Sequence, residues 1–506
     1  MPRPGLARFK PGQAPSVAVV GGGIAGLAAA TSLAERGARV TLYEQQDALG
    51  GRLAGHRTRL ADGSPATMSR GFHAFFRQYY NLRGLLRRTD PGLDRLTPLP
   101  DYPLRHSGGL TDSFARVPRT PPLSALGFVA LSPTFGWRDL AAMDPRAALP
   151  LLDVRVPEVY ERFDHISAKD FLESVRFPEA AHHLAFEVFS RSFFADPGEL
   201  SAAELLLMFH IYFLGSSEGL LFDVPNEPFP QALWEPLGAY LQRLGADVRT
   251  GAPVHGILPR DGEDGADGEG ADLLTDAGVD RHDAVVLALD PGGLSRLVAA
   301  SPGLGTSAWR EDIAALRTAP PFLVSRLWLD RPVRADRPGF LGTSGYDGLD
   351  NISVLDRYEG EAARWAGAHH GAVVELHAYA ADAQQETMQD RLVEQLRQVY
   401  PETREARVVD ARHEWRADCP HFPVGSHHRR PTVETPHPWL VLAGDGIRCD
   451  LPVALMERAA TTGFLAANSL LADRGVTGQV LWTVPRAGRS SMLRAVSALD
   501  RRRGRP

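Results

Sequence analysis

Short apolar runs separated by long, less regular stretches set the pattern of this chain. Val17–Val20, Ala284–Leu289 and Val441–Ala443 are uninterrupted apolar segments of strand length. Runs of this kind are typical of buried strands. Because the three runs lie far apart, the pattern predicts one sheet assembled from separated segments, with the intervening chain forming a second domain.

The length of the chain supports a division into two domains. At 506 residues it is too long for one ordinary core. We expect an α/β domain from residues 15–100, 231–300 and 431–475, and an inserted α+β domain from residues 101–230 and 301–430. Residues 1–14 are expected to be disordered, and residues 476–506 to form a basic C-terminal tail.

A glycine-rich turn follows the first apolar run. Gly21, Gly23 and Gly26 have GxGxxG spacing, directly after the run and at the start of an Ala/Leu-rich segment. The first glycine permits a tight turn, the second lets the backbone approach a pyrophosphate, and the third allows close packing of helix on strand. Glu44 ends the next apolar run, where a carboxylate can bind a ribose hydroxyl pair. Together they predict a Rossmann-type dinucleotide site, and the carboxylate disfavours a 2′-phosphate.

Two further motifs favour FAD over NAD as the dinucleotide. Gly51 and Arg52 follow soon after the acid, and Gly444 and Asp445 end the third apolar run. The ribityl chain of FAD extends away from the first glycine turn, and an aspartate at a strand end supplies an acceptor for its hydroxyls. No second GxGxxG follows a strand elsewhere, so no NAD(P)H domain is predicted. Oxygen or a quinone is then the expected electron acceptor.

Composition and charge exclude several classes of function. A net charge of −6 gives no reason to expect a nucleic-acid partner. Cys419 and Cys449 have no metal or redox spacing, so no metal site is predicted and a reducing cytoplasm is favoured. The N-terminus lacks the apolar segment of a signal peptide. The apolar stretch Leu205–Leu214 is about half the length that a membrane-spanning helix needs.

The order of these motifs resembles the superfamily of FAD-dependent amine oxidases and carotenoid desaturases. Residues 69–82, SRGFHAFFRQYYNL, are similar to the GxHxFFxxYxN stretch of plant-type and cyanobacterial carotene desaturases. With residues 101–104 and 112–114 included, the chain resembles the bacterial carotenoid φ-ring synthases. The likeness extends from about residue 17 to about residue 467.

The resemblance implies a cofactor site and a reaction. By motif position, FAD would be contacted by Gly21, Gly23, Gly26, Glu44, Gly51, Arg52, Val254, Gly444, Asp445 and Met456. The implied reaction converts a β-ionone end ring into an aromatic φ-ring by desaturation with a 1,2-methyl shift. The carbon count does not change, so no methyl donor is required. FAD carries the redox chemistry, and the protein supplies orientation and electrostatics.

Aromatic faces are the expected lining of a pocket in which a ring cation forms. The candidates from the motif stretch are Phe72, Phe75, Phe76 and Tyr79. Further candidates are Tyr80, Phe186, Phe189, Phe193, Phe194, Phe209, Tyr212 and Phe213. His73 is the candidate base for the final deprotonation. A hydrogen-bonded structural histidine is the alternative interpretation.

A carotenoid dissolves only in lipid, so the resemblance implies a cytoplasmic enzyme bound peripherally to the inner face of a membrane. The aromatic-rich segment Leu205–Phe222 is the candidate docking surface or channel mouth. Three other functions stay open. They are a carotene desaturase or isomerase without methyl migration, an amine oxidase, and a non-catalytic lipid-escort protein on the same fold. His73 and its aromatic neighbours stand where amine oxidases have an acid-Gly-His pattern, which disfavours amine chemistry.

Overall fold

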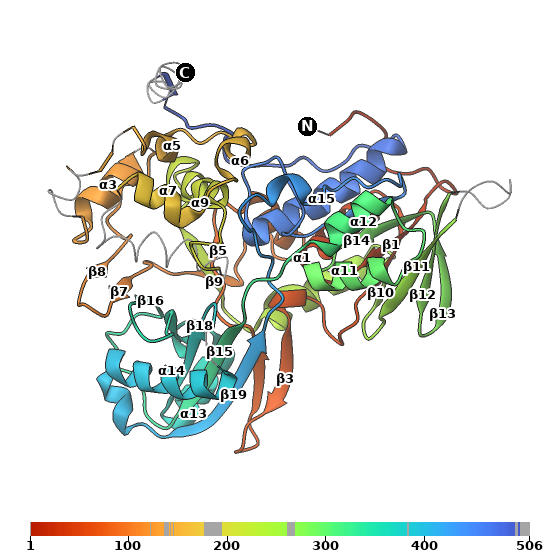
Figure 1. Cartoon of the computed structure of the whole chain (residues 1–506). Helices are drawn as coiled ribbons and strands as arrows, with labels where there is room; N and C mark the ends of the chain where they lie inside the picture. The colour runs from red at the N-terminus through yellow and green to blue at the C-terminus, as the bar shows by residue number, and fades with distance from the viewer. Residues whose placement is uncertain are drawn as a thin grey trace.

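A computed structural model describes residues 2–121, 123–135, 141, 143–144, 146–176, 195–260, 269–381, 384–490 and 494–495. Figure 1 shows three groups of elements in these ranges. A sheet with helices α1 and α15 lies beside the antiparallel strands β11–β13, a second sheet carries α13 and α14, and a group of short helices includes α3 and α9.

A five-stranded parallel sheet, in the order β10-β2-β1-β14-β20, organises the first group. Its strands are β1 (Ser16–Val20), β2 (Arg39–Tyr43), β10 (Asp247–Arg249), β14 (Ala284–Leu287) and β20 (Leu440–Leu442). Val286 of β14 pairs with Val19 on one side and with Val441 on the other. The three distant apolar runs therefore lie side by side. The predicted Rossmann-type α/β class is confirmed.

Two helices pack against each other beside this sheet. They are α1 (Ile24–Glu35) and α15 (Leu455–Asp473), and most of the residues on both are buried. The close approach depends on Gly463, because a Cβ there would lie 2.2 Å from the carbonyl oxygen of Ala25. The antiparallel strands β11 (Val254–Arg260), β12 (Gly270–Thr275) and β13 (Gly278–His282) contact β1 and β14.

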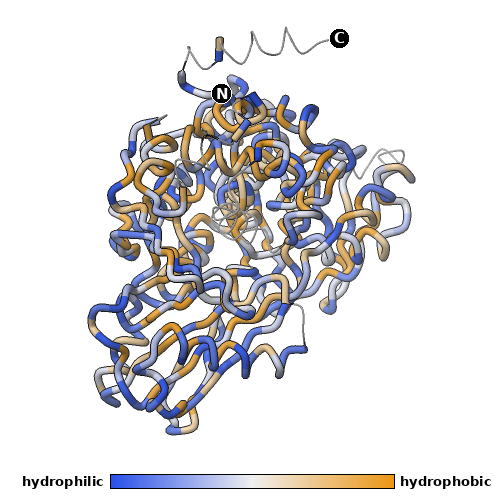
Figure 2. The backbone as a smooth tube through the Cα atoms, turned by 60° about the vertical axis from the view of Figure 1, so that its left-hand side comes forward, coloured by the Kyte–Doolittle hydropathy of each residue, from blue (hydrophilic) through white to orange (hydrophobic). Residues whose placement is uncertain are grey.

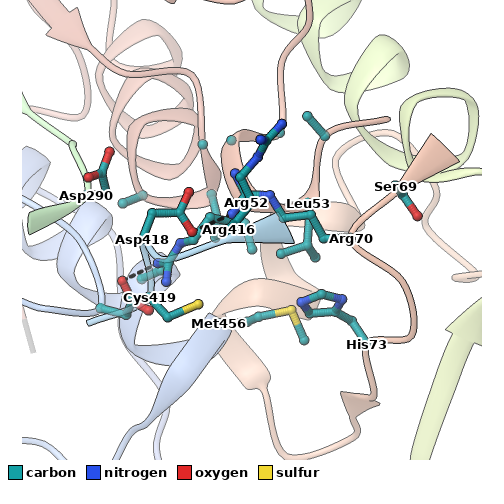
Figure 3. Close-up of a pocket in the computed structure, with 18 of the residues that line it drawn as sticks. Arg52, Leu53, Ser69, Arg70, His73, Asp290, Arg416, Asp418, Cys419 and Met456 are labelled. Carbon is teal, nitrogen blue, oxygen red and sulfur yellow. Dashed lines mark hydrogen bonds and ion pairs between the residues drawn. The ribbon is translucent and has the colours of Figure 1, made fainter. Parts of the chain in front are cut away.

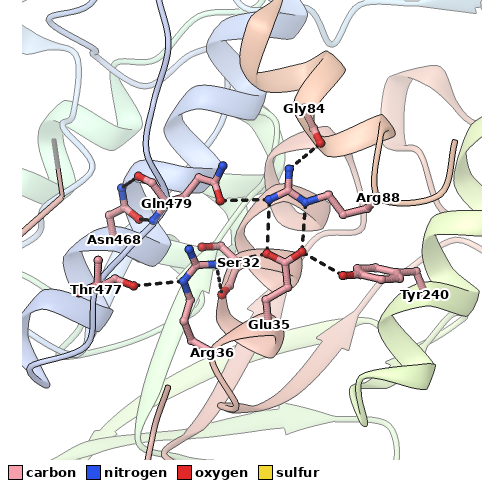
Figure 4. Close-up of polar contacts among 9 residues, drawn as sticks. All are labelled: Ser32, Glu35, Arg36, Gly84, Arg88, Tyr240, Asn468, Thr477 and Gln479. Atoms are coloured by element: carbon pink, nitrogen blue, oxygen red, sulfur yellow. Dashed lines mark hydrogen bonds and ion pairs between the residues drawn. The ribbon is translucent and has the colours of Figure 1, made fainter. Parts of the chain in front are cut away.

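A polar network fixes the end of α1 to neighbouring helices (Figure 4). Glu35 accepts hydrogen bonds from Arg88 at 3.1 and 3.3 Å and from the Tyr240 hydroxyl at 3.0 Å. Arg88 also donates to the Gln479 side chain at 3.0 Å. The network joins α1 to the chain after α2 (Tyr80–Leu86), to α10 (Glu235–Arg243) and to the segment after α15.

The N-terminal segment meets the chain that directly follows α15. Leu6, in the segment expected to be disordered, donates to Gly475 at 2.9 Å and accepts from Thr477 at 2.8 Å. Val476, in the expected basic tail, is buried. Hydrogen bonds to the chain after α15 thus hold Leu6, which lies in the segment that was expected to be disordered. The remainder of the proposed domain division stays a prediction.

A seven-stranded sheet, in the order β19-β15-β18-β17-β16-β7-β8, forms the second group. Its strands are β7 (Leu104–His106), β8 (Thr111–Asp112), β15 (Phe322–Leu329), β16 (Phe340–Ser344), β17 (Asn351–Val354), β18 (Ala372–Ala378) and β19 (Val408–Arg416). Helices α13 (Gly360–His369) and α14 (Gln385–Val399) accompany it. Strands β15 to β18 are buried along their whole length.

The third group consists of short helices with a core of their own. They are α3 (Leu123–Leu131), α5 (Leu149–Leu152), α6 (Glu158–Phe163), α7 (Ala168–Ser174) and α9 (Ala202–Phe209). Figure 2 shows hydrophobic segments gathered in the upper interior of the molecule, with hydrophilic segments over the outside of the lower part.

Smaller strands join the three groups. β3 (Gly55–Arg59) pairs with β4 (Pro65–Ser69), and β5 (Phe75–Phe76) and β6 (Leu96–Pro98) both pair with β9 (Phe222–Pro225). The motif stretch 69–82 thereby passes between the two large sheets. Among the described residues, no helix is long and apolar enough to cross a membrane. The described part of the chain also holds no group of three or more His, Cys, Asp or Glu side chains suited to a metal ion.

Candidate active site

A cavity of about 1730 Å³ lies between the two large sheets. Val20, Tyr43 and Gly444 line it from the carboxyl ends of β1, β2 and β20, which is where open α/β sheets bind ligands. Thr343 and His377 line it from the seven-stranded sheet. One cavity therefore combines a nucleotide-type edge with a wall from the seven-stranded sheet.

The glycine turn at the first edge has no room for side chains. Gly21 has a φ of +105°, and a Cβ there would lie 2.3 Å from the carbonyl oxygen of Ala288. A Cβ on Gly26 would lie 1.8 Å from the carbonyl oxygen of Gly21. No side chain caps the N-terminus of α1, so its first N–H groups are available to a phosphate. This cradle fits a dinucleotide.

Glu44 is held rigidly at the same edge. One carboxylate oxygen accepts from the backbone N–H of Gly22 at 2.7 Å, and the other accepts from Gln46 at 2.8 Å. The side chain is buried but lines the cavity, together with Val254. Each carboxylate oxygen can accept more than one hydrogen bond. Glu44 can therefore still take ribose hydroxyls, as its position in the motif predicts.

An ion pair marks the opposite end of the cofactor region. Arg52 donates to Asp445 at 2.5 Å, which joins the Gly50–Gly51 turn to the end of β20. Burial alone would lower the pKa of Arg52, but the Asp445 carboxylate raises it above its ordinary value. Arg52 is therefore charged. Sequence reasoning named each residue separately and missed that they form a pair.

Most of the predicted site residues meet in this one cavity. It is lined by Gly21, Gly23, Glu44, Gly51, Arg52, Phe72, His73, Phe76, Tyr79, Val254, Gly444, Asp445 and Met456. Figure 3 shows Arg52, His73 and Met456 around one part of it, together with Cys419. Gly26 does not line the cavity but packs behind the turn, as the third glycine of the motif should. Phe75 is also absent from the lining, because it is fully buried against Phe229.

His73 stands in the cavity wall as a neutral imidazole. Its Nδ1 lies 2.9 Å from the carbonyl oxygen of Gly71. Because a carbonyl only accepts, Nδ1 carries the proton and Nε2 keeps its lone pair. Burial lowers the pKa of His73 to about 4. The geometry is compatible with the predicted role as a base and with a structural role.

Aromatic rings cover the wall that faces away from the glycine turn. Phe72 stacks on Phe340 with centroids 4.1 Å apart, and Phe76 lies 4.6 Å from Tyr212. The hydroxyls of Tyr79 and Tyr212 are 2.8 Å apart. Of the further candidates, Tyr80, Phe209 and Phe213 do not line the cavity, and Phe186, Phe189, Phe193 and Phe194 lie outside the described residues.

The interpretation of Leu205–Phe222 as a docking surface is wrong, whereas its alternative interpretation as a channel mouth stays a prediction. Every residue from Leu205 to Met208 is buried, and so are Ile211 to Leu214. The hydrophobicity of this segment instead supplies the core of the helical group. Met208, Tyr212, Leu220 and Phe222 line the cavity. The segment is a wall of the site, and its side chains do not form a surface for lipid.

A polar group in β18 was not found from the sequence. Glu375 accepts from the backbone N–H of Phe72 at 2.8 Å and from Arg326 at 2.8 and 3.0 Å, and its Oε1 lies 3.0 Å from His377 Nε2. His377 Nδ1 lies 2.8 Å from the Tyr379 hydroxyl. Burial alone would raise the pKa of Glu375. The Arg326 guanidinium and the hydrogen bond from His377 act in the opposite direction, and the pKa is lowered to about 2. The available signal was the Glu-x-His-x-Tyr spacing, which places alternate side chains on one face of a strand.

Comparison with known proteins identifies the family. Residues 24–471 match the model of the flavin-containing amine oxidoreductases. The chain belongs to this family. Its cofactor is accordingly FAD, and the prediction of an FAD-dependent oxidoreductase is confirmed. The glycine cradle, Glu44 and the Arg52–Asp445 end of the cavity are the residues that fit this cofactor, and their individual contacts with it remain predictions.

Two curated relatives of this chain are named carotenoid φ-ring synthase. The protein from Streptomyces griseus is 71% identical over 497 residues, which cover 98% of this chain and 95% of the relative. The protein from Chlorobaculum tepidum is 29% identical and covers 93% of this chain and 90% of the relative. The resemblance drawn from the motif stretch is thereby confirmed.

Solved structures show the same fold. Putrescine oxidase with bound putrescine has a TM-score of 0.67 at 17% identity, covering 90% of this chain and 99% of that chain. An oxidoreductase from Methanosarcina mazei has a TM-score of 0.63 at 16% identity, covering 88% and 98%. These likenesses concern the fold alone.

Proposed function

We propose that this FAD-dependent oxidoreductase converts the β-ionone end ring of a carotenoid into an aromatic φ-ring. The observation that carries the proposal is the 71% identity, over nearly the whole chain, to a relative of that activity. The aromatic wall of the cavity supports it, because ring faces stabilise a cation without offering a nucleophile that could be alkylated. No specific observation favours an amine oxidase or an escort protein.

The residues of the cavity have separable roles in this proposal. FAD, when bound, supplies the capacity to accept hydride from the ring. Glu44 and the uncapped start of α1 would hold its nucleotide half. Phe72, Phe76 and Tyr212 would orient the end ring and exclude water. The partly buried Arg52–Asp445 pair would fix the Gly50–Gly51 turn.

Pigment analysis tests the reaction directly. Expression in a host that accumulates β-carotene should yield a product in which each converted ring has lost four hydrogens and no carbon. A desaturase without methyl migration would leave two methyl groups on one ring carbon, which proton NMR distinguishes from an aromatic ring. Unchanged pigment from a flavin-loaded protein would contradict the proposal.

We further propose that the reduced enzyme passes its electrons to oxygen or a quinone. The support is that, in the sequence, no second glycine motif follows a strand. Substrate-reduced enzyme, prepared without oxygen, should be reoxidised by air or by a soluble quinone. Rapid reoxidation by NAD⁺ or NADP⁺ would refute this choice of acceptor.

Peripheral membrane binding is the third part of the proposal, and α3 is its support. Leu123, Leu126 and Leu131 on this helix are 55%, 57% and 54% exposed, and the helix carries no charged residue. Its inner face connects to the site, because Phe128 stacks at 4.9 Å on Phe114, which lines the cavity. The proposed lipid-facing surface would thus lie one ring away from the proposed path of the substrate.

Replacing Leu126 by glutamate should weaken membrane binding. A charge on the exposed face of α3 opposes insertion into the apolar boundary of a bilayer. Co-sedimentation with vesicles of anionic and neutral phospholipid should fall several-fold for Leu126→Glu, whereas flavin content stays unchanged. Val279→Glu, at a 58% exposed position on β13, is the matched control and should co-sediment as the wild type does. Equal co-sedimentation of both variants would remove α3 from the proposal.

A further inference from the structure

Three side chains of one strand segment form a continuous hydrogen-bonded line into the cavity. Glu375, His377 and Tyr379 alternate along β18 and the residue that follows its end. Oε1 of Glu375 is 3.0 Å from His377 Nε2, and His377 Nδ1 is 2.8 Å from the Tyr379 hydroxyl. His377 and Tyr379 line the cavity, whereas Glu375 lies behind them and is fully buried.

The proton positions on this line follow from which groups can accept. Glu375 is ionised beside Arg326, whose Nε and Nη2 lie 3.0 and 2.8 Å from its Oε2, so the carboxylate can only accept. His377 Nε2 must therefore carry a proton. In the neutral imidazole, Nδ1 then holds a lone pair, and the Tyr379 hydroxyl donates to it. Each hydrogen bond in this line is therefore donated from the cavity side toward the buried Glu375 carboxylate.

The surroundings of Tyr379 suit a group that meets an apolar substrate. The Asn351 side-chain amide donates to the Tyr379 hydroxyl at 3.0 Å and holds its orientation. Phe322 and Tyr102 line the same cavity. A protonated phenol hydroxyl is a poor nucleophile, so a ring cation beside it does not alkylate it. An exposed carboxylate in the same place could be alkylated.

We propose that Tyr379 and His377 form the proton relay that deprotonates the end ring during aromatisation. The inference rests on the proposed function. A ring C–H bond breaks, its electron pair stays in the ring as the new double bond, and the proton goes to the Tyr379 oxygen. Tyr379 passes its own proton to His377 Nδ1, and Glu375 stabilises the resulting imidazolium. The step needs no oxidant, because no electron leaves the ring in it.

This relay differs from the His73 hypothesis in its support. His73 Nδ1 donates to the carbonyl of Gly71, an uncharged partner. His377 instead donates to the Glu375 carboxylate. A carboxylate stabilises an imidazolium much better than a carbonyl does. The arrangement of base and buried acid matches the way catalytic triads orient and stabilise their histidine.

Two substitutions test the relay in the full-length, flavin-loaded enzyme. Tyr379→Phe removes the acceptor oxygen, and His377→Gln keeps a hydrogen-bond acceptor and donor but cannot take up a proton. Each should lower kcat for formation of the aromatic product by about 100-fold or more, with KM nearly unchanged, as expected for loss of a general base. Tyr400→Phe is the control, since Tyr400 is fully buried in the same domain and does not line the cavity.

The outcomes separate the relay from a structural role and from failure of the proposed function. Wild-type kcat in His377→Gln would overturn the relay, because that variant can only position Tyr379. Wild-type kcat in Tyr379→Phe would overturn it as well. Loss of flavin or of thermal stability in both variants, beyond that of Tyr400→Phe, would make the role structural. If the wild-type enzyme itself forms no aromatic product, the proposed function fails first.

Asp350→Asn is a further check, since Asp350 also lines the cavity. An inactive Asp350→Asn variant together with an active Tyr379→Phe variant would assign the base to Asp350.

Discussion

Gly26→Ala should yield protein with little or no bound flavin. The added Cβ would lie 1.8 Å from the carbonyl oxygen of Gly21, far inside van der Waals contact. The neighbour is backbone, so the glycine turn itself must move. Overpacking of this kind costs about 1–3 kcal/mol. The turn is the proposed pyrophosphate cradle, and each 1.4 kcal/mol lost from binding lowers affinity about tenfold.

Absorbance near the flavin band, measured per mole of purified protein, checks this expectation. Gly367→Ala is the matched control, since that glycine lies in α13 and a Cβ there meets nothing within 4 Å. It should bind flavin normally and gain up to about 1 kcal/mol of stability. Gly23→Ala adds a second comparison, because its Cβ would meet only the backbone of Gly51, with Cα at 3.7 Å and N at 4.0 Å. That variant should fold normally and still lose flavin, if Gly23 faces the pyrophosphate. A fully yellow Gly26→Ala protein would contradict the argument.

Glu204→Gln should destabilise the protein strongly. Glu204 on α9 accepts from Arg430 and from Arg458 of α15, both at 2.8 Å, and all three side chains are buried. Removing the carboxylate leaves two buried guanidinium groups without their counter-charge. Breaking a buried ion pair in this way costs about 3–5 kcal/mol. Glu173→Gln is the control, because Glu173 is 57% exposed and its contact with Lys169 spans 4.0 Å. Its cost should stay below about 1 kcal/mol.

The stabilisation from Glu204 should also depend on pH. Burial alone would raise the pKa of this carboxyl, but Arg458 and Arg430 lower it to about 2. A group whose pKa is lower in the folded state stabilises that state fully above its unfolded pKa, and this contribution declines as pH falls toward the folded value. The difference in unfolding free energy between wild type and Glu204→Gln should therefore shrink between about pH 5 and pH 2. A difference that stays constant over this range would show that folding does not lower the pKa of Glu204.

The parts of the site that sequence reasoning recovered are those with local physical causes. The spacing of Gly21, Gly23 and Gly26 is dictated by one turn between one strand and one helix. Asp445 follows the end of a buried strand, and carboxyl ends of parallel strands meet at one edge of a sheet. The error at Leu205–Phe222 has an equally clear cause. A hydrophobic run indicates only that a segment is kept from water. It does not show what covers the segment, which here is part of the core and of the cavity wall.

The sequence by itself determined the α/β class, the FAD cofactor, the resemblance to φ-ring synthases and a set of site residues, most of which line the cavity. Each of these depends on motifs whose parts lie within one or two elements. Tertiary structure alone decided that Arg52 meets Asp445, that Glu204 lies between two arginines, and that Glu375, His377 and Tyr379 run into the cavity from a different sheet. The ion pairs join residues more than 200 positions apart. The direction of Glu375, His377 and Tyr379 depends on which face of a fully buried strand meets the site. Both faces of such a strand are covered, so its sequence shows no hydrophobic–polar alternation that would indicate which face meets the site.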